Sequence, residues 1–128
     1  MSATNSRLAS AAQRACLALV DDLDGRATAL IATADGFAIG HAGTNRVDPA
    51  RLAAVISSIA ALGNAASVET DIGATKSLVV DSNDGRMVMR CLSVAGESLV
   101  VVLLTDAQVL MGRVLNRLGD AGRLMEAR

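Results

Sequence analysis

A long charge-free stretch constrains the fold of this chain more than any other feature. No charged side chain occurs from Leu52 to Val68. Asp48 can cap the first free backbone N–H groups of a helix, and Pro49 suits its first position. Bulky apolar residues then recur every three or four positions and predict one broad apolar helix face: Leu52, Val55, Ile56, Ile59 and Leu62.

The rest of this predicted helix, residues 48–67, carries small uncharged side chains. They are Ala53, Ala54, Ser57, Ser58, Ala60, Ala61, Ala65 and Ala66. A helix with one side in water normally carries charges there, so we expect this helix to be covered on both sides. The bulky face would pack on a sheet, and the small face would meet a second copy of the same helix. The alternative is a helix buried within one monomeric domain.

Length and composition predict one domain with an aliphatic core. The 128 residues are 52% hydrophobic and 1% aromatic, with a net charge of −1. A chain of this length forms a single core without staples, so we expect one domain over 1–128, frayed at 1–6 and at about 121–128. The mixed charges argue against a nucleic-acid partner, because nucleic-acid binding requires a basic face.

The expected location is the cytoplasm. The sequence has neither a run of eighteen apolar residues nor an apolar signal core near its start, so we expect no membrane insertion. Cys16 and Cys91 are isolated thiols in segments expected to be buried, which favours a reducing compartment over a disulfide framework. Eleven of the twelve basic residues are Arg, a bias that suggests a bacterial genome rich in G and C.

The pattern along the chain predicts an α/β (α+β) fold with the order α-β-β-α-β-β-β-α. Helices are expected at 7–23, 48–67 and 107–126, with Gly25 ending the first and Thr105 or Asp106 capping the last. Strands are expected at 27–33, 37–42, 76–80, 86–93 and 98–104, with Asp-Gly turns at 35–36 and 84–85. The run at 98–104 is apolar throughout and should be the central strand of a five-stranded, mainly antiparallel sheet. Helices must then cover both faces, the two end helices on one and the middle helix on the other.

The sequence offers little chemistry. It contains no phosphate-binding loop and no Gly-x-Ser-x-Gly elbow. The acids near Asp22 are expected to be solvated turn residues, His41 is expected at a surface or edge, and Cys91 has no base nearby in sequence. We therefore predict no catalytic residue, no metal and no cofactor. An arginine finger from Arg46, Arg86 or Arg90 is conceivable.

Four features, in this order and spacing, resemble a bacterial Roadblock/dynein light chain domain. They are the ALIATADGFAIG hairpin, the DPARLAAVISSIAALGNAAS helix, the KSLVVDSNDGRMVMRCL hairpin and the overall order of elements, which together cover about residues 7–120. The resemblance implies a homodimer in which two sheets join through the strand at about 76–80 and the two middle helices pack side by side. The implied interface residues are Ala54, Ser57, Ser58, Ala61, Ala65, Lys76, Leu78 and Val80.

The resemblance also implies a function. Members of that family lack catalytic residues of their own, and many bind Ras-like small GTPases as activators or scaffolds in bacterial signalling, polarity or motility. It therefore argues against an arginine finger. The alternative is a small-ligand sensor module of related α/β shape, although such sites usually have aromatic walls, which one Phe cannot supply.

Overall fold

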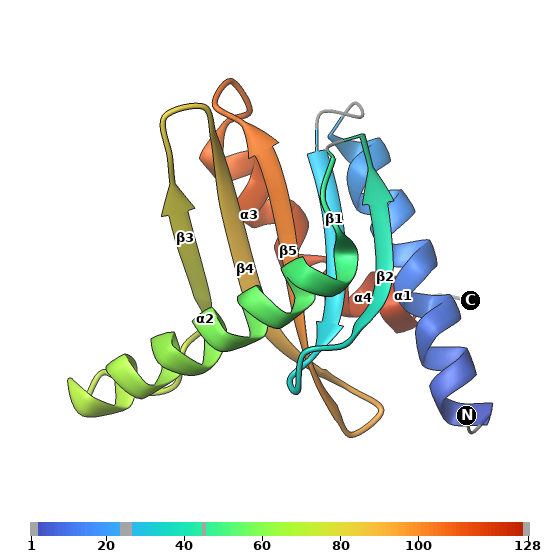
Figure 1. Ribbon diagram of the computed structural model, residues 1–128, viewed down its shortest axis with the longest axis horizontal. Coiled ribbons are helices and arrows are strands. Elements are labelled where there is room, and N and C mark those ends of the chain that lie inside the picture. The colour runs from blue at the N-terminus through green and yellow to red at the C-terminus, as the bar shows by residue number, and fades with distance from the viewer. Residues whose placement is uncertain (1–2, 24–26, 45, 127–128) are drawn as a thin grey trace.

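The computed structural model describes residues 3–23, 27–44 and 46–126, and in them the predicted α+β architecture is confirmed. The strands form one antiparallel sheet with the order β2-β1-β5-β4-β3 (Figure 1). The elements are α1 (Ala3–Asp22), β1 (Ala27–Thr33), β2 (Ala38–Gly43), α2 (Pro49–Glu69), β3 (Ser77–Asp81), β4 (Gly85–Val94), β5 (Glu97–Asp106), α3 (Met111–Gly119) and α4 (Ala121–Glu126).

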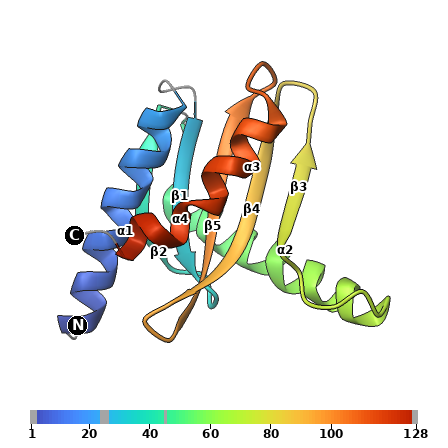
Figure 2. The ribbon, with the colours of Figure 1, turned by 180° about the vertical axis from the view of Figure 1, so that it is seen from behind.

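The strand β5 lies at the centre of the sheet, as its continuous apolar run predicts. Its side chains alternate between two separate cores. Val101 and Leu103 pack with α1, α3 and α4 on one face, and Val100 and Val102 pack beneath α2 on the other. The two views in Figures 1 and 2 show the end helices on one side of the sheet and α2 alone on the other.

The turns follow the sequence signals. Gly36 has a φ of 100° in the β1–β2 turn, a left-handed conformation that glycine adopts without strain. The turn between β4 and β5 has positive φ at both Ala95 and Gly96. The β1–β2 register is irregular near Gly40, because Ile31 pairs with Gly40 but the next residue, Ala32, pairs with Ala38.

The C-terminal helix differs from its prediction. The strand β5 continues to Asp106, whose carboxylate accepts a hydrogen bond from Gln108 N at 3.0 Å in a turn. Helix α3 begins only at Met111, after Leu110, which provides no side-chain cap. Helix α3 ends at Gly119, and α4 follows after Asp120 as a separate short helix. The glycines of this region lower helix propensity, so packing on the core decides where the helix breaks.

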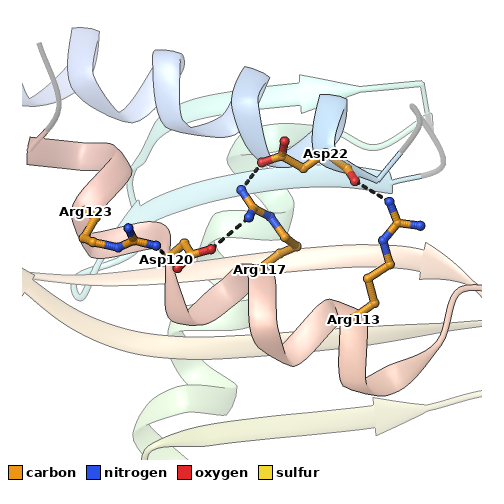
Figure 3. A network of polar contacts seen from close by, with 5 residues as sticks. All are labelled: Asp22, Arg113, Arg117, Asp120 and Arg123. Atoms are coloured by element: carbon orange, nitrogen blue, oxygen red, sulfur yellow. Dashed lines mark hydrogen bonds and ion pairs between the residues drawn. The ribbon is translucent and has the colours of Figure 1, made fainter.

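An ion-pair network fastens these two short helices to the end of α1 (Figure 3). Arg117 pairs with Asp22 and, at 2.8 Å, with Asp120, which also pairs with Arg123. Arg113 donates to the backbone oxygen of Asp22 at 2.8 Å. Asp22 is therefore a half-buried anchor for α3, and its prediction as a solvated turn residue was wrong.

Within the described residues, helices extend into both segments that were expected to fray. Helix α1 begins at Ala3, inside the segment expected to fray. Ala121 and Met125 of α4 are buried against the core. The helix stop predicted at Gly25 lies outside the described residues.

Candidate protein-interaction surface

Helix α2 packs on the sheet through a narrow stripe of mostly small side chains. Ala53, Ile56, Ser57 and Ala60 are its buried residues. The Ser57 hydroxyl donates to Ala53 O at 2.7 Å and lies 3.1 Å from Thr33 O of β1. The prediction that the bulky face meets the sheet was therefore only partly correct. The sheet itself supplies the bulk here, through Leu30, Met89, Val100 and Val102, so small helix residues complete the packing.

The outward side of α2 is an uncharged surface open to solvent. Val55 is 52% exposed and Leu62 is 71% exposed, although both were predicted to face the sheet. Ala54, Ser58, Ala61 and Ala65 are exposed beside them, spaced at four, three and four residues along one flank. Within the described chain, no element covers this side of the helix. The alternative of a helix buried on both sides within a monomer is therefore contradicted.

Strand β3 forms one edge of the sheet, next to this helix. Its residues are exposed or half-buried, and Val79 and Val80 are 45% and 38% exposed. β3 pairs only with β4, and no other part of the described chain bonds to its outer edge. An edge strand with free backbone N–H and C=O groups is a template for pairing with another chain.

The C-terminal half of α2 projects past β3, beyond the edge of the sheet (Figures 1 and 2). No α2 residue after Ala60 is buried, and Val68 and Ile72 are 63% and 77% exposed. Two contacts brace the loop that follows. Thr75 N donates to Asn64 Oδ1 at 3.2 Å, and the hydroxyls of Ser67 and Thr75 lie 3.0 Å apart.

Gly63 sets the close approach of α2 to β3. A Cβ atom at this position would lie 2.6 Å from Leu78 Cδ2. Leu78 therefore sits directly under the helix and is half-buried by it. The helix and the open strand edge thus lie side by side, and we call the outward side of α2 together with the edge of β3 the α2–β3 surface.

Most of the predicted interface residues lie on this surface. Ala54, Ser58, Ala61 and Ala65 lie on its helix flank, and Leu78 and Val80 lie on its strand. Lys76 is exposed just before β3 begins. Ser57 is the exception, because it is buried against its own sheet and its hydroxyl bonds within the chain. The interface role of the other residues stays a prediction.

Sequence reasoning missed one prominent residue. Phe37, the single aromatic side chain, is 67% exposed in the β1–β2 connection. The preceding Gly36 packs against α2, since a Cβ there would be 3.6 Å from Ala54 Cα. Phe37 therefore lies beside the N-terminal half of α2, which is the half that packs on the sheet. The sequence did contain a signal for this residue, because Phe37 is the single aromatic side chain and directly follows an Asp-Gly turn.

The cysteines do not form a reactive centre. Burial raises the pKa of the Cys16 thiol to about 12, although a backbone hydrogen bond with Ile31 acts in the opposite direction. Cys91 is exposed, contrary to its prediction, and the partial burial of its side chain also raises its pKa. Both thiols are therefore protonated near neutral pH, whereas the thiolate is the reactive form.

The other residues considered for chemistry do not assemble into a site. The described residues contain no group of three or more His, Cys, Asp or Glu side chains that could hold a metal ion. Arg86 is engaged, with its Nε 3.3 Å from Asp81 Oδ1 and its Nη1 donating to Val109 O at 2.7 Å. His41 lies half-buried on the edge strand β2, as predicted.

A groove of about 850 Å³ lies on the opposite face, between α1, the β4–β5 turn and α4. Its lining includes Arg7, Leu8, Arg14, Val94 and Met125, without an aromatic side chain. Small-ligand sites are usually enclosed and lined by aromatic residues. This groove therefore gives the sensor alternative no support.

Helix α2 is long and apolar enough to cross a bilayer by length and composition alone. Its inward stripe, however, is already packed on the sheet of the same chain. We therefore interpret its exposed apolar side as a surface for another protein.

The fold and surface define a class of protein: a small α+β domain whose open strand edge adjoins an uncharged, half-covered helix. The family model described as "Roadblock/LC7 domain" matches residues 12–104. The chain therefore belongs to the Roadblock/LC7 family. A search of curated proteins found no match.

Solved structures agree on the fold. Myxococcus xanthus MglB matches with a TM-score of 0.76 and 16% identity, over 98% of this chain and 89% of that chain. The gliding protein MglB from Thermus thermophilus matches with a TM-score of 0.76 and 17% identity, over 98% and 90%. A structure titled "MglB with tetrameric arrangement" matches with a TM-score of 0.75 and 20% identity, over 98% and 93%.

Proposed function

We propose that this chain is a non-enzymatic adaptor of the bacterial cytoplasm that forms a homodimer and binds a Ras-like small GTPase. The observation that carries the proposal is the α2–β3 surface, where an uncharged helix flank adjoins an unpaired strand edge. Membership of the Roadblock/LC7 family supports the proposal, because the resemblance to that family implies binding to such GTPases. The described residues hold no group of three or more His, Cys, Asp or Glu side chains that could bind a metal ion, and burial keeps both thiols protonated near neutral pH.

A dimer with its two-fold axis beside β3 would cover both the open edge of this strand and the exposed side of α2. Antiparallel pairing of β3 with its copy would join two sheets into one and satisfy the outer backbone groups. The projecting half of α2 would then lie beside its copy. The small residues Ala61 and Ala65 of this half would let the two helix axes approach to about 8 Å, the close end of the usual range.

The GTPase would dock on the part of α2 that this dimer leaves open. Phe37 and Val55 are exposed near the N-terminal half of the helix, away from its C-terminal end. An exposed aromatic side chain in a short connection beside a helix is suited to anchoring a partner protein. A dimer presents two such anchors, one from each chain.

The experiment is a binding titration with the Ras-like GTPase encoded nearest to this gene, loaded with GDP or with a GTP analogue. We expect binding that differs between the two nucleotide states. Phe37→Ala should weaken it about 5- to 30-fold, corresponding to about 1–2 kcal/mol for a hot-spot side chain. Leu17→Ala is the matched control, because Leu17 is 56% exposed on α1 at the other face of the sheet.

Absence of binding in both nucleotide states would contradict the proposed partner. Equal losses for Phe37→Ala and Leu17→Ala would contradict the proposed docking position. Neither result bears on the homodimer, which is measured separately.

A further inference from the structure

The sheet has two edges, and they differ in one respect that the proposed function leaves unexplained. β3 is open at one edge, whereas β2 at the other edge lies against α1 (Figures 1 and 2). An uncovered edge at both ends would allow chains to add without limit, because each added copy would present a new edge. Something must therefore close the β2 edge if association is to stop at two copies.

Gln13 of α1 occupies the β2 edge with two hydrogen bonds. Its side-chain Nε2 donates to His41 O at 2.8 Å, and its Oε1 accepts from His41 N at 3.0 Å. Both bonds go to the backbone of a single residue in β2. This is the pattern that a residue in a neighbouring antiparallel strand makes in a hydrogen-bonded pair. A primary amide reproduces it because it carries one acceptor oxygen and donor hydrogens, as a peptide group does.

Gly40 brings the helix close enough for this contact. A Cβ atom at Gly40 would lie 2.7 Å from the backbone carbon of Ala12 and 2.8 Å from its oxygen. The strand backbone and the helix backbone are therefore in direct contact at Ala12, which is fully buried. Gln13 follows by one residue and reaches over the outer edge of β2.

The opposite edge has no equivalent. In the part of the chain that the structure describes, no side chain bonds to the outer backbone groups of β3. We propose that Gln13 acts as a substitute strand that closes the β2 edge, so that the sheet associates only through β3. Gln13 is then a specificity-determining residue for assembly, and its role does not depend on the GTPase.

The first test measures amide hydrogen exchange at His41 by NMR. Gln13→Leu keeps a side chain of similar size but removes both bonds, and we expect the His41 amide to exchange at least about tenfold faster. The amides of Gly40 and Ala42 should not change. Gln13→Asn retains the amide on a shorter side chain that falls short of His41, so it should give the same result. Arg14→Leu, on the adjacent exposed residue of α1, is the control and should leave the His41 amide unchanged.

This measurement is best made in an Ala61→Glu background as well as in the wild-type chain. The exchange result then does not depend on whether the proposed homodimer forms. Gln13 is exposed, so its replacement should leave the core and the fold intact.

The second test measures assembly by sedimentation over a range of concentrations. Gln13→Leu should form species larger than those of the wild-type chain, and their share should grow with concentration. Arg14→Leu should behave as the wild type does. Unchanged exchange at His41 in both Gln13 variants would overturn the proposal. Faster exchange with wild-type mass at every concentration would also overturn it, because α1 alone would then close the edge.

Discussion

Ala61→Glu is expected to give a folded monomer. Ala61 is exposed in the single chain, at the middle of the uncharged flank of α2. Substitution at an exposed helix position should change the free energy of unfolding of the monomer by only about 0.5 kcal/mol. In the proposed dimer the same carboxylate would be buried without a partner, at a cost of about 3 kcal/mol or more. The dissociation constant should then rise at least about a hundredfold, which light scattering after size-exclusion chromatography measures directly.

The matched control is Ser10→Glu, which adds the same charge to an exposed position of α1. This variant should keep the wild-type mass. If Ala61→Glu is well folded by circular dichroism and also keeps the wild-type mass, the α2 flank is not the interface.

Ile56→Ala and Val55→Ala are expected to affect different properties, stability and partner binding respectively, although the two residues are adjacent in sequence. Ile56 is fully buried on the side of α2 that faces the sheet, whereas Val55 is 52% exposed. Removing buried methyl groups leaves a cavity, so Ile56→Ala should lower the free energy of unfolding by about 2–5 kcal/mol. Val55→Ala should change it by about 0.5 kcal/mol or less and should instead weaken binding to the partner.

Urea denaturation in the Ala61→Glu background separates these effects, since unfolding is then not coupled to dissociation. Comparable losses of stability for the two variants would mean that Val55 is buried by the chain itself. That result would contradict the orientation of α2, and with it the position of the whole α2–β3 surface.

The sequence was sufficient for the sheet because its signals are local. The continuous apolar run around Val101 predicted a strand buried on both faces, and β5 is the central strand. The Asp-Gly pair at 35–36 forms the β1–β2 turn, where Gly36 supplies the positive φ, whereas Gly85 of the second pair is the first residue of β4. The strand boundaries differ from the predictions by at most two residues.

Tertiary contacts decided what the sequence did not predict. Helical periodicity groups Val55 with Ile56, but it cannot say which part of a broad apolar arc meets the sheet. The bulky Leu30 and Met89 of the sheet decide which side of α2 faces them, because they leave room mainly for small residues such as Ala53 and Ala60. The break between α3 and α4 likewise depends on contacts that are distant in sequence, such as the pair of Arg117 with Asp22.

The candidate surface was predicted in outline but not in detail. The absence of charge between Leu52 and Val68 indicated a helix that needs a second cover, and its outer side is exposed in the single chain. Ser57 was wrongly included, because a small side chain is compatible with either a tight interface or a tight core. Gln13 could not be recognised at all, since nothing in the sequence relates it to His41 until α1 is placed beside β2.

The most direct test of the central claim is the solution mass of the wild-type protein at several concentrations. The chain mass is 13.0 kDa, and we expect a stable species of twice that mass through the α2–β3 surface. A mass of 13.0 kDa at every concentration, with the flank of α2 freely accessible to solvent, would contradict the claim that this helix meets its own copy.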